Sequence, residues 1–205
     1  MHYTTTYQSP LGGITLAADG EALTGLWFEG QKYFALYLDK EHEEKDLPVF
    51  EQTKQWLDIY FSGRNPDFTP PMHFTGSDFQ NEVWAILAAI PYGKTRTYGD
   101  IAREMAAKRG LSRMSAQAVG GAVGKNEISI IVPCHRVVGT NGSLTGYAGG
   151  IHKKIELLRL EGALKPFYFS ERFGRSLYIL SRERAGIQDK ICFVKTHETG
   201  GQKCS

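Results

Sequence analysis

The chain has few cysteines, no long apolar run and no leader-like start, and each of these features excludes a class of protein. Three cysteines among 205 residues, with no short spacing between any two, argue against a disulfide framework and a Cys-x-x-Cys zinc site. No apolar run approaches the roughly 18–20 residues of a membrane span, and the N-terminus lacks the pattern of a secretory signal. We therefore expect a cytoplasmic protein with no membrane partner. No zinc-ligand cluster appears in the N-terminal half, so no metal is expected. We also expect a monomer without a cofactor.

Charge is distributed unevenly along the chain. Residues 1–78 hold 5 Lys and Arg against 12 Asp and Glu, residues 79–164 hold 11 against 6, and residues 165–205 hold 8 against 4. The net charge of +2 therefore combines an acidic first part with a basic remainder. A basic region that meets a polyanion would explain this pattern, and a chance distribution of surface charge is the alternative.

The first 73 residues have the pattern of a small antiparallel sheet with one helix. Runs of β-branched and aromatic residues predict strands at 3–9, 13–19 and 23–29. An apolar face with helical spacing predicts a helix over 47–63, and the polar stretch 39–46 is expected to be a loop or a helix end. The proline-rich stretch 64–74 predicts a linker, so the first domain is assigned to residues 1–73.

Helices dominate the second part, which is assigned as a domain over residues 74–164. Apolar periodicity and capping residues predict helices at 77–91, 97–110, 112–126 and 149–162. The second and third of these are closely spaced and form a candidate helix-turn-helix. Residues 165–205 are treated as a C-terminal extension with no assigned structure. The expected fold class is α+β.

The helix predicted over 112–126 consists almost wholly of small residues. Its stretch "SAQAVGGAVG" places Gly120 and Gly121 near the middle, where each glycine costs roughly 1 kcal/mol relative to alanine. A surface on which another molecule approaches the backbone closely would account for this cost, and a DNA backbone or narrow groove fits that description. Tight packing on a neighbouring helix is the alternative.

The stretch "IIVPCHRVVG", which begins at Ile130, carries the most chemistry. The apolar run predicts a strand, and Pro133 interrupts it just before Cys134 and His135. A thiol must lose its proton to attack, and histidine is a suitable base when a third group orients it. Glu161 is the candidate for that third group, unless it is a solvated residue at a helix end. A buried, unreactive Cys134 is the alternative to a nucleophile.

A glycine-rich loop follows this stretch. Residues 139–150 hold five glycines in "GTNGSLTGYAGG". Such a loop can wrap a planar ligand and present backbone N–H groups, while a mobile surface loop is the alternative.

These pieces together resemble a known family. "PCHRVVG" followed by "GSLTGYAGG" and "LLRLEG", all downstream of "AVGGAVGKN", resembles the O6-alkylguanine-DNA alkyltransferases, and the "SPLGG" opening is similar to the bacterial constitutive form. The resemblance covers about residues 79–164 most specifically. It implies an RNase H-like first domain and a winged helix-turn-helix second domain. It also implies irreversible, single-turnover transfer of an alkyl group from O6-alkylguanine in DNA, and leaves O4-methylthymine open as a second substrate.

The resemblance implies a role for each matched residue. Cys134 would accept the alkyl group, His135 would act as its base through a water, and Glu161 would hold the imidazole. Asn126 would bridge turn backbone beside this network. Tyr98 would donate to guanine N3 and help to rotate the nucleotide out of the duplex. The guanine pocket would comprise the carbonyls of Cys134 and Val137, the amide of Ala148, and Tyr147.

The family also inserts its small-faced helix into the minor groove of double-stranded DNA. Many members carry an arginine immediately before "AVGGA", where this chain has Gln117. We hypothesise that Gln117 fills the space left by the flipped base more weakly, with compensating phosphate contacts from Arg113 or Lys125. The full set of implied DNA contacts is Gln117, Ala118, Gly121, Arg113, Lys125 and Arg136.

Other functions remain open at this point. A damage-binding relative would recognise alkylguanine without repairing it, but the intact Pro-Cys-His-Arg argues against that possibility. A helix-turn-helix transcription factor would select a DNA sequence. A Cys-His hydrolase would turn over repeatedly.

Overall fold

The computed structural model describes residues 1–140 and 142–164, together with four short strands near the C-terminus. These strands are β7 (Phe169–Arg172), β8 (Arg175–Tyr178), β9 (Cys192–Val194) and β10 (Lys203–Cys204), in the sheet order β10-β9-β8-β7. Most of the extension predicted over 165–205 lies outside the described residues.

The N-terminal sheet has the strand order β3-β2-β1-β4. Its strands are β1 (His2–Ser9), β2 (Gly12–Ala18), β3 (Leu23–Phe28) and β4 (His42–Glu44). The first three are antiparallel neighbours, as the sequence predicts, whereas β4 pairs with β1 in parallel. The expectation of a loop or helix end over 39–46 was therefore wrong for three residues, because β4 adds its backbone to the free edge of β1.

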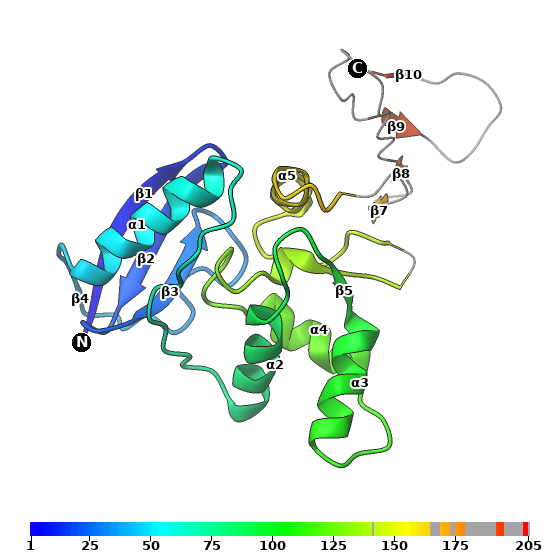
Figure 1. The fold of residues 1–205 in the computed structure, drawn as a ribbon, viewed down its shortest axis with the longest axis horizontal. Helices are drawn as coiled ribbons and strands as arrows, with labels where there is room; N and C mark the ends of the chain where they lie inside the picture. The colour runs from blue at the N-terminus through cyan, green and yellow to red at the C-terminus, as the bar shows by residue number, and fades with distance from the viewer. Residues whose placement is uncertain (141, 165–168, 173–174, 179–191, 195–202, 205) are drawn as a thin grey trace.

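Helix α1 (Pro48–Phe61) packs against β1 and β2 (Figure 1). Pro48 occupies the first turn, where its missing N–H has no helical partner to lose. The buried face includes Phe50, Trp56 and Tyr60, and the rings of Trp56 and Tyr60 stack at 5.2 Å between centroids. The last turn of α1 thus brings an aromatic hydroxyl, that of Tyr60, into the interior.

Four helices form most of the second part. They are α2 (Asp78–Ala88), α3 (Tyr98–Lys108), α4 (Ala116–Gly124) and α5 (Ile151–Leu160). Ser77 and Thr97 cap α2 and α3 in complete capping boxes. Helix α4 begins at residue 116 rather than at the predicted 112, because the Ser115 hydroxyl accepts the first free amides, those of Gln117 and Ala118. The α+β class is confirmed.

The predicted strand over residues 130–132 was wrong, although its burial was predicted correctly. These residues form a buried turn in which Ile130 has a φ of 70°, and the strand β6 comprises only Val137–Val138. It pairs in parallel with β5 (Arg96–Thr97). The turn is held by side-chain hydrogen bonds from Asn126 to the backbone, which replace the hydrogen bonds of a strand.

One continuous apolar core joins the N-terminal sheet to the helices. The edge of β3 also pairs with the turn that leads to Cys134, since Leu26 N–H donates to the Glu127 carbonyl at 2.8 Å and Ser129 N–H donates to the Leu26 carbonyl at 2.9 Å. The sheet therefore supports the segment that carries the thiol. A bilayer-spanning helix does not occur among the described residues, since none combines the required length and apolarity.

Candidate active site

Cys134 begins a single 3-10 turn, η1 (Cys134–Arg136), and is 3% exposed. Its Sγ accepts a hydrogen bond from Asn126 Nδ2 at 3.1 Å. Burial raises the pKa of the thiol, and the Asn126 hydrogen bond and the Lys154 charge offset this only in part. The sulfur is therefore a protonated thiol near neutral pH and needs a base before it can attack.

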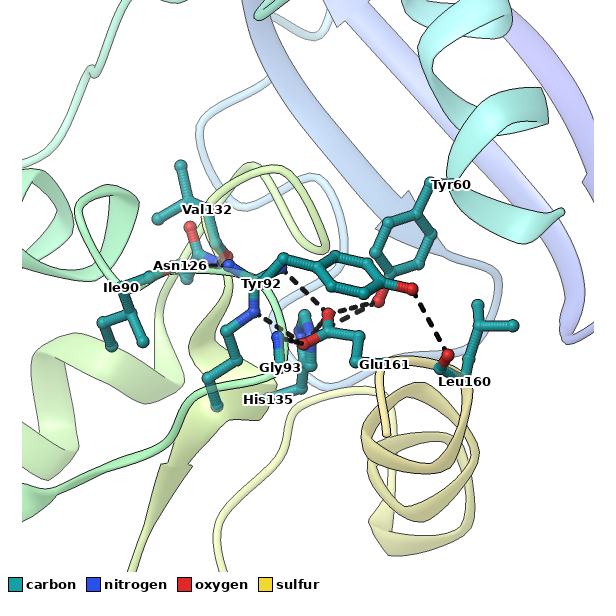
Figure 2. A network of polar contacts seen from close by, with 10 residues as sticks. Tyr60, Ile90, Tyr92, Gly93, Asn126, Val132, His135, Leu160 and Glu161 are labelled. Carbon is teal, nitrogen blue, oxygen red and sulfur yellow. Dashed lines mark hydrogen bonds and ion pairs between the residues drawn. The ribbon is translucent and has the colours of Figure 1, made fainter. Parts of the chain in front are cut away.

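His135 is fully buried beside Glu161, which it meets through Nε2 and Oε1 at 2.6 Å (Figure 2). Burial lowers the pKa of the imidazole, although Glu161 acts in the opposite direction, so the ring is neutral near pH 7. An ionised carboxylate can only accept, so Nε2 carries the ring proton. The lone pair then lies on Nδ1, which is buried and has no hydrogen-bond partner among the described residues.

Glu161 follows the last residue of α5 and is the centre of this network (Figure 2). Arg136 donates to both of its carboxylate oxygens, at 2.8 and 3.0 Å, Tyr60 donates to Oε1 at 2.7 Å, and the Gly93 amide donates to Oε2 at 3.3 Å. Burial alone would raise the pKa of Glu161, but the hydrogen bonds from His135 and Arg136 and the positive charge of Arg136 outweigh it and hold the pKa at about 2. The carboxylate is therefore ionised at all physiological pH values.

Asn126 holds the turn that precedes the thiol. Its Nδ2 donates to the Val132 carbonyl at 2.7 Å, and its Oδ1 accepts from the Ile128 amide at 3.2 Å. The enclosed Ile130 adopts a left-handed backbone that a β-branched residue rarely takes. A single side chain thus fixes a strained turn and also contacts the sulfur.

The loop predicted to bind guanine lies beside glycines of α4 and accepts a backbone hydrogen bond from Lys32 of the N-terminal part. It borders a cleft of about 550 Å³ whose lining includes Tyr147 and Ala148. The Tyr98 hydroxyl donates to the Thr145 carbonyl at 3.2 Å, and burial raises its pKa to about 12, so it remains a donor. The Val137 carbonyl accepts from Lys154 at 2.5 Å and keeps a second lone pair.

Two buried contributors to the site were not found from the sequence. The amine of Lys154 is fully buried, donates to the carbonyls of Val137 and Thr145, and has its pKa lowered by burial to about 8. A lysine on the apolar face of α5, three residues after Ile151, was a signal that could have revealed it. Tyr60 gave no such signal, because an aromatic residue on an apolar helix face is ordinary core.

Most residues predicted to contact DNA lie on one exposed region around α4. Gln117, Ala118, Gly121, Arg113 and Lys125 are all exposed. Arg136 is not: its guanidinium is buried, pairs with Glu161 and donates to the Ile90 carbonyl at 2.5 Å. Its placement therefore does not suit the predicted phosphate contact, because the residue after His135 turns into the core with η1. Arg136 instead neutralises the buried carboxylate.

The chain is similar to two family models that together span nearly all of residues 1–163. The model for "6-O-methylguanine DNA methyltransferase, ribonuclease-like domain" matches residues 1–74. The model for "6-O-methylguanine DNA methyltransferase, DNA binding domain" matches residues 78–163.

Individual proteins that match the chain are also named as methyltransferases of this kind. A methylated-DNA--protein-cysteine methyltransferase of Mycobacterium tuberculosis is 43% identical over 166 residues, which is 81% of this chain and 95% of the relative. The constitutive methylated-DNA--protein-cysteine methyltransferase of Bacillus subtilis is 37% identical over 150 residues, 73% of this chain and 88% of the relative. The structure of Mycobacterium tuberculosis OGT in complex with DNA matches with a TM-score of 0.68 at 42% identity, covering 78% of this chain and 93% of that one.

Proposed function

Because the chain belongs to the 6-O-methylguanine DNA methyltransferase family, we propose that Cys134 is the residue that accepts the alkyl group. The chain is a DNA-binding alkyltransferase that repairs DNA directly, by moving an alkyl group from the damaged base to one of its own cysteines. The observation that carries the assignment to Cys134 is its contact with Asn126 beside the neutral His135. Each molecule acts once, because the thioether formed on sulfur is not reversed.

The proton of the Cys134 thiol passes to Nδ1 of His135 through an intervening water. The thiolate sulfur then attacks the alkyl carbon on guanine O6, so that the S–C bond forms as the C–O6 bond breaks. Negative charge grows on the departing guanine, and the Tyr98 hydroxyl, which stays protonated, donates to N3 to stabilise it. Glu161 and Arg136 take no part in bonding to substrate and keep the imidazole oriented.

The nucleotide reaches the thiol by leaving the duplex. Helix α4 has an exposed face that includes Ala118 and Gly121, and this face lets a minor groove approach the backbone. Gln117, which is exposed at the start of α4, fills the space left by the flipped base. The loop with Tyr147 and Ala148 receives the base. The substrate is double-stranded DNA with O6-alkylguanine, and O4-methylthymine stays a second candidate substrate.

The proposal also covers the domain bounds, the oligomeric state and the cellular location. The supporting domain spans residues 1–73, the catalytic and DNA-binding domain spans 74–164, and the extension spans 165–205. The protein acts as a monomer, and it acts in the cytoplasm.

Incubation with duplex DNA that carries radiolabelled O6-methylguanine tests the proposal. Label should move to protein until each molecule holds one methyl group, and should not move to the Cys134→Ala variant. Repeated turnover would indicate a hydrolase. Binding to the damaged duplex without any transfer would indicate a damage-recognition protein.

A further inference from the structure

The cleft beside α4 has a wall that the second domain does not supply. Gly120, Gly121 and Gly124 of α4 form one side, and the loop residues 144–148 form another. The third side consists of Lys32 and Tyr33, which follow β3 in the N-terminal part of the chain.

A backbone hydrogen bond fixes this third wall against the loop. The Lys32 amide donates to the Ala148 carbonyl at 3.0 Å, so residues 31–33 and the loop form one continuous rim. The side chain of Gln31 is buried beneath them and accepts from the Phe28 amide at 3.0 Å. The positions of Lys32 and Tyr33 are therefore set by the fold, even though both side chains are exposed.

Charge and chemistry indicate what occupies the cleft. Among the residues that the structure describes, Lys32 is the only charged one that lines the cleft, and none of them forms an ion pair with Lys32. Its ammonium lies 4.7 Å from the centre of the Tyr33 ring, which is 38% exposed. A lone cation beside an exposed ring is the combination that binds a nucleic-acid strand, with the cation on a phosphate and the ring against a base or sugar.

We propose that Lys32 and Tyr33 are DNA-contacting residues of the N-terminal domain, and that they hold the strand carrying the alkylated base at the mouth of the cleft. The inference rests on the proposed function, because the same cleft is lined by the glycines of α4 and by the loop that is proposed to receive the alkylated base. Lys32 pairs with a phosphate of that strand. Tyr33 packs on the nucleotide beside the lesion. The N-terminal domain is acidic as a whole, but the positive charge of Lys32 lets it add to DNA binding.

Salt dependence of binding tests the role of Lys32. The Cys134→Ala protein is used so that no transfer occurs, with duplex DNA that contains O6-methylguanine. Removal of one lysine–phosphate pair should reduce the slope of log affinity against log salt by about 0.9. Lys32→Gln should show that reduction, whereas Lys40→Gln, an exposed lysine of the same segment outside the cleft, should keep the parent slope. Equal slopes in the two variants would overturn the pairing of Lys32 with phosphate.

Tyr33→Ala has a matched control in Phe34→Ala. Phe34 is similarly exposed, at 42%, but does not line the cleft and lies 6.0 Å from Trp27 between ring centres. Tyr33→Ala should weaken binding roughly tenfold with the salt slope unchanged, since the variant removes an uncharged ring that stacks on the nucleotide. The same weakening in both variants, or in neither, would remove Tyr33 from the DNA-binding surface.

These experiments distinguish a failure of the inference from a failure of the proposed function. If Lys32→Gln and Tyr33→Ala behave like their controls while the parent protein still takes label from O6-methylguanine DNA, only the inference about the N-terminal domain fails. If the parent protein takes no label, the proposed function fails.

Discussion

His135 Nε2 lies 2.6 Å from Glu161 Oε1, and this contact determines which nitrogen of the imidazole can act as a base. With the ring proton held on Nε2 by an ionised carboxylate, the lone pair remains on Nδ1. That atom is buried and has no partner among the described residues. The fold therefore keeps one basic nitrogen available in the interior, next in sequence to the thiol.

The transfer rate should be insensitive to pH down to and below pH 6.5. Burial lowers the pKa of His135 from its ordinary value of 6.5, so the neutral, proton-accepting form persists to more acidic pH. Single-turnover rates on O6-methylguanine duplex test this across a pH series, with circular dichroism as a control for folding. A rate that already halves above pH 6.5 would contradict the assignment of His135 as a neutral base.

Glu161→Gln should destabilise the protein by about 3 kcal/mol, because the variant leaves the Arg136 guanidinium buried without its counter-charge. The pH dependence follows from the pKa of Glu161, which folding lowers from 4.5 to about 2. The contribution of ionised Glu161 to the free energy of unfolding is complete above pH 4.5 and is lost as the pH falls from there towards 2. Urea unfolding at neutral and acidic pH measures both effects. If the parent and the variant lost the same stability on acidification, Glu161 would not be the group that titrates.

Gly121→Ala should separate stability from DNA binding. No atom lies within 4 Å of the position that a Cβ would occupy, so the methyl group fits without strain and should stabilise α4 by about 1 kcal/mol. The same methyl group would stand on the face that we propose approaches DNA, so affinity should fall, and fall further in Gly121→Leu. Thermal unfolding and DNA titration measure the two effects. Unchanged affinity in Gly121→Leu would show that DNA does not approach this face.

Gln117→Ala should weaken the binding of damaged duplex and slow the transfer, because the variant lacks the side chain that we propose fills the space of the flipped base. The substitution keeps the helix cap, since Ser115 accepts from the backbone amide of residue 117 and not from its side chain. Gln117→Arg, which introduces the arginine that the resemblance led us to expect at this position, should improve both quantities. If Gln117→Ala left both unchanged, another residue would have to fill the space.

The sequence pointed to the residue types of the candidate site but not to the contacts between them. Cys134, His135 and Glu161 were identified by residue type and by the resemblance, because a thiol, an imidazole and a carboxylate leave distinct signatures. The structure brings His135 and Glu161 together in the interior. The buried turn before Cys134 was mistaken for a strand, because an apolar run has the same composition in either conformation.

Other features depended on contacts between distant segments. The Tyr60 hydroxyl reaches Glu161 across 101 positions of sequence, and no local pattern encodes that contact. Arg136 was expected to contact DNA on the strength of the resemblance, but its side chain turns into the core with η1 and pairs with Glu161. The parallel pairing of β4 with β1 likewise depends on tertiary placement rather than on strand propensity.

Mass spectrometry of the protein after reaction with O6-methylguanine duplex identifies the residue that accepts the alkyl group. The chain offers its own controls, since Cys192 and Cys204 are the other two cysteines. We expect one added methyl group on the peptide that contains Cys134, with Cys192 and Cys204 unmodified. A methyl group on either of those residues, or no methyl group on any cysteine while the DNA lesion disappears, would show that Cys134 is not the acceptor.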